Sequence, residues 1–384
     1  MKTAESAALS SSPVGASPAE TMRVWLLHLL CFVLPTACLA FGLTAPHPWW
    51  ASLPFLMVVA GSIWIDMRSP GEHRQPVALM PAWPFDGVLY VLVATQLASV
   101  ALLVRTVAEN GFWRIDTLVG VLLIGINSGY SAIVVAHELV HRSRPHMQWL
   151  GRLLLWTVLY DHFAIEHVRG HHARVGTADD PATARFGETA VSFLRRTIPA
   201  QFASAWRLEK KRLGDESMSW RDARMLRNRM LHGLVIEWTV PLALLVVLGA
   251  GAAVVYVLQA VVAVRLLEAV NYFEHYGLSR TSRRVRPIDS WDTDSWFTLY
   301  TLVGLSRHAD HHANAARPYQ QLRYFDESPK LRYGYFGTVT WLIFANRSFR
   351  AAMAAELERR KLGPFAPREE SGGVAVESAM RAAV

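Results

Sequence analysis

Histidine is the residue type whose spacing in this sequence points most clearly to chemistry. Nine of the fifteen histidines fall in four short segments, which are residues 137–141, 166–172, 271–277 and 307–312. In the first segment, His137 and His141 stand four residues apart, so both imidazoles lie on one face of a helix and can reach one metal. Imidazole binds iron, copper, zinc and nickel, so the pattern predicts a metal centre without choosing the metal. The predicted ligands are His137, His141, His167, His171, His172, His275, His308, His311 and His312.

Nine imidazoles exceed the roughly four ligands of a zinc site. The adjacent residues His171 and His172 would point about 100° apart on a helix, which suits two metals better than one. The remaining six histidines are interpreted as ordinary surface or core residues. They are His28, His47, His73, His146, His162 and His232.

Each segment also carries a carboxylate beside a histidine: Glu138, Glu166, Glu274 and Asp310. Metal-bound histidines commonly donate their outer N–H to such groups, so we expect most of these four to support ligands and one to approach the metal itself. Another acidic residue, Glu268, lies one turn from Arg265 and is predicted to form an ion pair with it near the membrane interface.

The first segment also matches the HExxH signature of zinc proteases. In that interpretation His137 and His141 hold zinc and Glu138 is the general base. The alternative stays open as an intramembrane zinc protease, although it leaves six clustered histidines unexplained.

The composition places these histidines in a membrane protein. Of the 384 residues, 52% are apolar and 18% are charged, against about 25% charged in a typical soluble domain. The net charge is +8, but the basic residues lie beside apolar blocks, which favours anionic lipid rather than nucleic acid as their partner. Cys31 and Cys38, the two cysteines, form neither a disulfide framework nor a CxxC metal site.

The apolar residues form blocks that predict an all-α fold, an integral membrane bundle of six transmembrane helices, and the histidine segments form a cap on it. A span needs about 20 apolar residues, and the block of about 40 from Leu231 to Val270 must fold back on itself near Gly249. The first block resembles a signal peptide, but its length favours a retained helix. The predicted spans are about 22–43, 49–65, 85–107, 117–136, 231–249 and 251–270, within a single domain over 21–361 that disordered tails flank at 1–20 and 362–384.

The distribution of basic residues orients the bundle. Segment 142–230 holds 16 Lys and Arg and the segment after Asn271 holds another 16, whereas the opposite loops hold only Arg105 and Arg114. By the positive-inside rule, both termini and all four histidine segments face the cytoplasm. Two further apolar segments, Trp149–Ile165 and Phe336–Phe349, are predicted to lie at the interface.

The histidine segments resemble those of the AlkB-type membrane alkane monooxygenases, which belong with xylene monooxygenase and the fatty acid desaturases among membrane proteins with histidine-ligated di-iron sites. The spacing His137-x3-His141, His167-x3-His171-His172 and His308-x2-His311-His312 is shared by the whole group. More specific is the stretch 271–278, Asn-Tyr-Phe-Glu-His-Tyr-Gly-Leu, which is similar to the alkane hydroxylase signature. Shorter stretches at 180–182, 187–188, 204–209 and 319–320 support it.

The resemblance implies two non-haem irons that use O2 to convert the terminal methyl of an alkane, or of an alkyl side chain, to a primary alcohol. It also implies electrons from a separate rubredoxin or ferredoxin with an NAD(P)H-dependent reductase, a substrate dissolved in the bilayer, and a bacterial-type inner membrane. Val140, Arg142 and Val168 stand where the family usually has Gly, Lys and Asn. These departures leave every ligand histidine in place and leave the substrate class open.

Two alternatives remain beside the protease. A lipid desaturase or hydroxylase would use the same centre on acyl chains, and only residues 271–278 argue against it. A metal transporter or sensor would need polar residues along the spans, whereas the histidines cluster at one face.

Overall fold

The computed structural model describes residues 17–76 and 80–367. Within these ranges, six helical stretches are long and apolar enough to cross a bilayer, which confirms the predicted all-α membrane bundle; the backbone there forms isolated β-bridges but no strand. The stretches are Pro18–Thr44, Trp49–Asp66, Trp83–Asn110, Ile115–Val140, Arg229–Leu248 and Ala250–His275.

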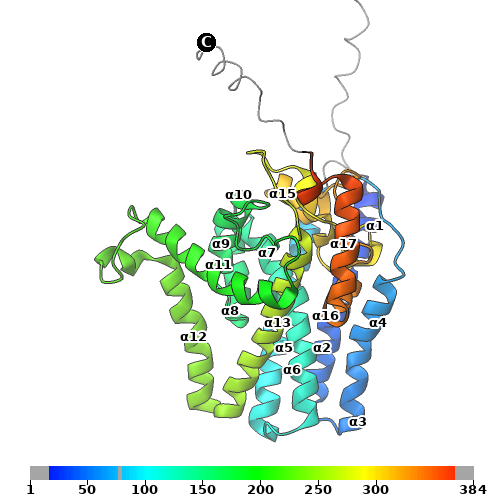
Figure 1. Cartoon of the computed structure of the whole chain (residues 1–384). Coiled ribbons are helices and arrows are strands. Elements are labelled where there is room, and N and C mark those ends of the chain that lie inside the picture. Colours follow the sequence, from blue (N-terminus) through cyan, green and yellow to red (C-terminus); the bar gives the residue numbers. More distant parts are fainter. Residues whose placement is uncertain (1–16, 77–79, 368–384) are drawn as a thin grey trace, which may run out of the picture.

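Three of the six spans are interrupted helices. The spans comprise α1 (Pro18–His28), η1 (Leu29–Phe32) and α2 (Val33–Thr44); α3 (Trp49–Ser52), η2 (Leu53–Phe55) and α4 (Leu56–Asp66); α5 (Trp83–Asn110); α6 (Ile115–Asn127), the π-helical η3 (Ser128–Ile133) and α7 (Val134–Val140); α12 (Arg229–Leu248); and α13 (Ala250–His275). They run side by side below a cap, for which we use the residues 141–228 and 276–367 (Figure 1).

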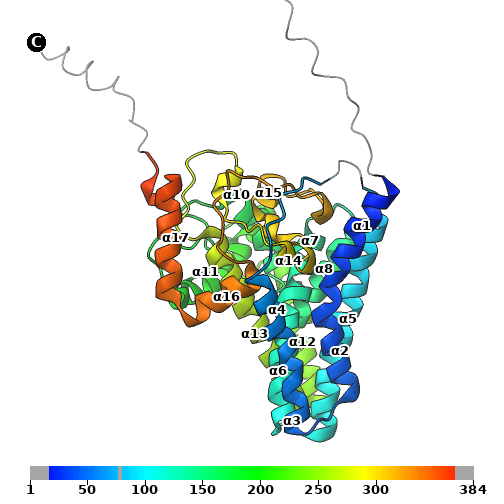
Figure 2. The same ribbon diagram turned by 90° about the vertical axis from the view of Figure 1, so that its right-hand side faces the viewer.

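Apart from the 23-residue α11, the cap consists of shorter helices and long connections. Its elements are α8 (Pro145–Thr157), α9 (Phe163–Glu166), the π-helical η4 (His167–His171), α10 (His172–Arg174), α11 (Ala190–Arg212), η5 (Ala223–Arg227), η6 (Pro287–Asp289), α14 (Trp296–Thr301), η7 (Leu305–Arg307), α15 (His308–Ala313), η8 (Tyr319–Gln321), α16 (Tyr335–Phe344), α17 (Asn346–Arg360) and η9 (Gly363–Phe365). Figure 2 shows α1 and α17 at the same end of the bundle as α10 and α15. The first and last described helices therefore lie on the side of the cap.

Local sequence determines where the spans begin and turn. Ser17 caps α1 by accepting a hydrogen bond from the backbone of Glu20, and Asn228 caps α12 by accepting from Met230 and Leu231. Gly249 has a φ of 86°, a left-handed value that suits glycine, and it joins α12 to α13 at the end of the bundle opposite the cap. The predicted hairpin is therefore confirmed, although Gly249 forms the turn instead of ending the helix.

The fourth span lies at the centre of the bundle. Its apolar window is 83% buried, whereas the windows of the second and fifth spans are only 17% buried and face outward. A Cβ on Gly125 would approach the Cβ of Val262 to 2.6 Å, so glycine is needed where α6 packs on α13.

Polar side chains also join the spans. Asn127 donates to Gln96, Gln96 to Ser128 and Ser128 to Gln259, over distances of 2.7–2.8 Å. All four residues are fully buried, and in lipid each polar group needs such a partner. The chain of hydrogen bonds ties α5, the fourth span and α13 together beneath the cap.

The two predicted interfacial segments have different bounds from those expected. Instead of one helix over Trp149–Ile165, α8 ends at Thr157 and the chain turns through Leu159, whose φ is 54°, before α9 begins at Phe163. The turn is stabilised where the backbone N–H of Asp161 donates to Glu237 on α12 at 2.9 Å. Likewise, Phe336–Phe349 is divided at Ala345 between α16 and α17.

The predicted tails overlap the described residues only in part. Helix α1 begins at Pro18, so the predicted tail 1–20 is wrong at its inner end, and Gly363–Phe365 forms a 3-10 turn within the predicted tail 362–384. Residues 1–16 and 368–384 lie outside the described residues.

Candidate metal centre

Four helical segments bring the nine predicted ligands to one place, where the cap meets the bundle. His137 lies in the last turn of α7 and His141 follows it, while His275 ends α13, so two spans deliver their histidines at the same membrane face. The cap supplies the others from η4 and α10, which carry residues 167–172, and from α15, which carries residues 308–312.

The nine imidazoles divide into two groups, in each of which one ring nitrogen per residue lies within 4.8 Å of all the others. The five-histidine group is His137, His141, His167, His172 and His311, and the four-histidine group is His171, His275, His308 and His312. The neighbours His171 and His172 thus belong to different groups, while His137 and His141 share one.

The ring nitrogens within each group point at one another. The Nε2 of His172 lies 3.0 Å from the Nε2 of His167 and 3.1 Å from that of His311. In the four-histidine group, His171 and His312 approach to 3.2 Å, and His275 and His308 to 3.4 Å, again between Nε2 atoms. Because a neutral imidazole carries only one N–H, hydrogen bonds alone do not account for three converging nitrogens, whereas a shared cation does.

Burial keeps these imidazoles in the form that binds metals. It lowers the pKa of His141 to about 4, and His171 adds to the effect. The pKa of His167, His172, His308, His311 and His312 is likewise held well below 6.5 by burial and then by the other histidines. Neutral nitrogens with lone pairs turned inward fit a pair of metal ions, since metal ligation requires the deprotonated ring.

Among the described residues, the Nε2 atoms of His137 and His141 are buried without a hydrogen-bond partner. Buried polar atoms are nearly always paired in folded proteins, so such unpaired nitrogens call for a ligand. The observation supports a metal position within the five-histidine group.

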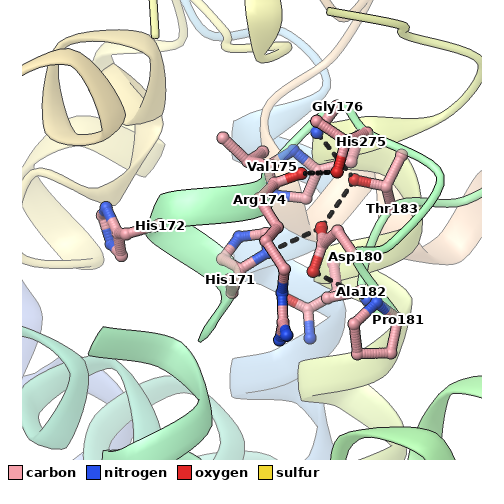
Figure 3. Close-up of polar contacts among 12 residues, drawn as sticks. His171, His172, Arg174, Val175, Gly176, Asp180, Pro181, Ala182, Thr183 and His275 are labelled. Carbon is pink, nitrogen blue, oxygen red and sulfur yellow. Dashed lines mark hydrogen bonds and ion pairs between the residues drawn. The ribbon is translucent and has the colours of Figure 1, made fainter. Parts of the chain in front are cut away.

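The carboxylate of Asp180 contacts the four-histidine group. This contact was not predicted, since Asp180 entered the sequence analysis only as part of the stretch 180–182. The Oδ2 of Asp180 lies 2.9 Å from the Nδ1 of His171 and accepts from the hydroxyl of Thr183 at 2.6 Å. Burial opposes ionisation, but His171 and Thr183 hold the pKa of Asp180 below its usual range. Figure 3 shows His171 turned toward Asp180 and His172 pointing away from it, so Asp180 fixes one ring and leaves its Nε2 for a metal.

Of the four predicted carboxylates, Glu274 meets a ligand histidine. Its Oε2 lies 3.2 Å from the Nε2 of His308, and its Oε1 accepts a hydrogen bond from the hydroxyl of Tyr335 at 2.6 Å. Because this His308 nitrogen belongs to the converging four-histidine group, Glu274 is the predicted carboxylate nearest to the point where a metal could be held.

The other three carboxylates differ from the expected contact, since each pairs with arginine. Glu138 bonds Arg142 at 2.6 Å, Glu166 bonds Arg174 at 2.6 Å, and Asp310 is held by Arg317 and Arg323, both at 3.1 Å. The helices turn these side chains away from the histidines and toward basic residues of the cap. Glu138 is thus engaged elsewhere, which removes the general base that a zinc protease requires.

The predicted ion pair between Arg265 and Glu268 is wrong. Arg265 is exposed on α13, whereas Glu268 is fully buried and accepts hydrogen bonds from Tyr160, Gln201 and Asn271 over 2.8–3.1 Å. One turn of helix separates the two residues along the chain, but they face opposite environments.

Two π-helical segments were not predicted, and they decide how the ligands divide. On a regular α-helix, His167 and His171 would share a face, yet within η4 they fall into different groups and His167 joins His172. The segment η3 lies just before His137 in the fourth span. Single π turns of this kind occur often at functional sites, but no residue type marks them in a sequence.

An apolar cavity extends from the histidines into the bundle. At its head are His137 and His167 of the five-histidine group, His308 of the four-histidine group, and Glu274. Its walls come from the fourth span and α13, and they include Tyr130, Ile133, Val134, Leu266, Leu267 and Val270. The cavity therefore borders both histidine groups.

The fold and the two histidine groups define a membrane protein of the fatty acid desaturase class, and the model of that family matches residues 112–339, more than half of the chain. Within the class, the chain is 34% identical to alkane 1-monooxygenase 1 of Pseudomonas aeruginosa, over 86% of this chain and 91% of that protein. It is 37% identical to alkane 1-monooxygenase 2 of Alcanivorax borkumensis, over 74% of each. The hydroxylase component of xylene/toluene monooxygenase from Pseudomonas putida is 25% identical, over 81% of this chain and 82% of that one. The chain therefore belongs to the alkane 1-monooxygenase family, which confirms the resemblance inferred from the histidine segments.

Proposed function

We propose that this chain is a membrane monooxygenase that binds two irons and hydroxylates the terminal methyl of an alkane, or of an alkyl side chain, to a primary alcohol. The observation that carries the proposal is the pair of converging histidine groups at the head of one apolar cavity. Iron, when bound there, supplies the reductive activation of O2, in which one oxygen atom enters a C–H bond and the other leaves as water, with two electrons and two protons consumed.

The chain's own residues supply positioning and a dry site. Tyr130, Leu266 and Val270 line a cavity along the membrane spans, so a substrate dissolved in the bilayer can enter end-on with its methyl toward His137 and His308. At the same end, the hydroxyl of Tyr335 donates to Oε1 of Glu274 and so orients the carboxyl whose Oε2 lies beside His308. Burial of all four residues of the four-histidine group excludes water from the reacting atoms.

The electrons are proposed to come from a rubredoxin or ferredoxin and its NAD(P)H-dependent reductase. The cap, which meets the donor in this scheme, carries most of the basic residues, and the positive-inside rule assigns it to the cytoplasm of a bacterial-type cell. Basic loops there favour an acidic protein partner.

The experiment is turnover by the purified full chain, loaded with iron(II) and supplied with rubredoxin, its reductase, NADH and O2. Octane should give 1-octanol in amounts that depend on both O2 and iron. Zinc as the only bound metal, with no dependence on O2, would contradict the proposal.

A desaturase or hydroxylase of acyl lipids is the second candidate, and the match to the fatty acid desaturase model favours it. The same assay distinguishes the two. Products formed only from added acyl lipids, with alkanes left unchanged, would establish this candidate in place of the first.

A further inference from the structure

A second cavity lies in the cap, away from the metal centre, and it is lined by basic side chains. It is bounded by the first turns of α1, by residues 74–75 and by the segment from Leu299 to Leu322. Three arginines contribute to its wall, Arg23, Arg74 and Arg307, together with one acid, Glu20. None of these residues lines the apolar cavity at the histidines.

Arg307 is the residue that most requires a partner. It is only 7% exposed, and its guanidinium donates to two backbone carbonyls, those of Leu322 at 2.5 Å and Arg74 at 2.7 Å. Within the described residues, no carboxylate lies within 4 Å of it. Arginine stays charged in proteins, and Glu72, Asp292 and Asp310 act on this guanidinium only from beyond ion-pair distance, so an anion bound in the cavity would stabilise the buried charge.

The other two arginines differ in how they are engaged. Arg74 is paired with Glu72 through two of its guanidinium nitrogens, whereas Arg23 is exposed and forms no ion pair with any described residue. All three arginines act on the hydroxyl of Tyr300. Burial and then the Glu72 carboxylate raise the pKa of Tyr300, and Arg307, Arg74 and Arg23 each oppose that rise, so three positive charges and one negative charge act on this hydroxyl.

Two uncharged side chains in the same wall also lack partners. His28 is 3% exposed and Gln320 is 4% exposed. Among the described residues, the Nδ1 of His28 and both amide atoms of Gln320 have no hydrogen-bond partner. A ring nitrogen and an amide N–H that both border the cavity can donate to the oxygens of an anion held by Arg307.

The position of the cavity along the first membrane span indicates the source of the anion. Arg23 stands between Met22 and Leu26 on the first span, and these two apolar side chains are 54% and 52% exposed, as expected where the helix meets lipid. Basic residues at this depth of a membrane helix contact lipid headgroups.

We propose that this cavity is a binding site for a phosphate-bearing anion, held by Arg307 and Arg23 with His28 and Gln320 as hydrogen-bond donors. The shared chemistry is a phosphate group, which either an anionic lipid headgroup or free inorganic phosphate supplies, and the position of Arg23 favours the lipid. The site is independent of the proposed oxidation.

The test is binding to the purified full chain in an uncharged detergent, measured by native mass spectrometry. Phosphatidylglycerol is compared with phosphatidylcholine of the same acyl chains, and a separate arm measures protection from thermal unfolding by inorganic phosphate. We expect a preference for phosphatidylglycerol that falls roughly fivefold in Arg23→Gln, the effect of one basic side chain near a phosphate.

Arg68→Gln is the matched control, because Arg68 is exposed near the cap end of α4, stacks on Trp64 and does not line the cavity. Gln320→Leu is a second variant, which removes donors from the cavity wall without removing a charge. Protection by inorganic phosphate that is lost in Arg23→Gln, without a lipid preference, would assign the site to free phosphate. The proposal is overturned if neither probe is preferred, or if Arg68→Gln lowers binding as much as Arg23→Gln and Gln320→Leu do.

Discussion

The two histidine groups share one cavity but differ in charge and in exposure. In the four-histidine group every residue is buried, and the carboxylates of Asp180 and Glu274 lie beside His171 and His308. In the five-histidine group, His141 and His172 are partly exposed. A carboxylate that accepts the outer N–H of a histidine raises its basicity as a ligand. Asp180 is placed to do so at the Nδ1 of His171, whereas Glu274 lies at the inward Nε2 of His308. We therefore expect two unequal metal positions, with the four-histidine group binding its metal more firmly.

The largest loss of metal and of turnover is expected from removing one predicted ligand of the four-histidine group. His275→Ala should lose one of two metals and lower alkane turnover by more than about 100-fold, because a lost ligand exceeds the 10–100-fold cost of a lost supporting residue. Iron per chain and turnover are measured together. His146→Ala is the control, since His146 is exposed and lies outside both groups. Unchanged iron in His275→Ala would remove this residue from the site.

The variant Asp180→Asn tests whether a carboxylate contact explains the expected difference in metal affinity between the two groups. The amide cannot hold His171 as the carboxylate does, so we expect a loss of about 10–100-fold in metal affinity or in activity. Glu138→Gln provides the contrast, because Glu138 pairs with Arg142 instead of a histidine. An equal loss of metal in the two variants would show that carboxylate contact does not distinguish the groups.

The clustering of the nine histidines could be predicted from the sequence, whereas the contacts around them could not. Histidine spacing and apolar block length are local signals, so the nine histidines and six spans could be read directly. The partner of each carboxylate depends instead on which arginine the folded cap brings near it, as with Glu166 and Arg174. The contact between His171 and Asp180 likewise depends on the path of the chain after α10, which no periodicity indicates.

The cavity where the two groups meet gives a third prediction, of moderate size. Tyr130 lines this cavity and also a neighbouring one near Leu34, and its ring lies 4.5 Å from that of Phe336. Tyr130→Ala should join the two spaces and shift the preference toward longer alkanes, by roughly tenfold in the ratio of kcat/KM for tetradecane to that for octane. Tyr130→Phe keeps the ring and should leave the ratio unchanged. A ratio that is the same in all three proteins would show that Tyr130 does not limit chain length.

The smallest effect concerns a buried histidine outside both groups. Burial lowers the pKa of His162 to about 4, so between about pH 4 and 6.5 the unfolded chain binds a proton that the folded chain does not. Stability therefore rises with pH across this window, and at most about 3 kcal/mol is lost as the pH falls through it. Thermal midpoints at pH 5.5 and 7.5 should differ less in His162→Gln than in the parent protein. Parallel pH profiles for the two proteins would contradict this role of His162.

The central claim is that the two histidine groups hold two irons, and metal content tests it most directly. The full chain, purified after expression in iron-replete medium, is analysed for iron and zinc per chain by plasma mass spectrometry. A chelator added in stages should remove the iron of the five-histidine group before that of the four-histidine group. We expect close to two irons per chain, and a single metal per chain, or zinc in place of iron, would contradict the two-iron proposal.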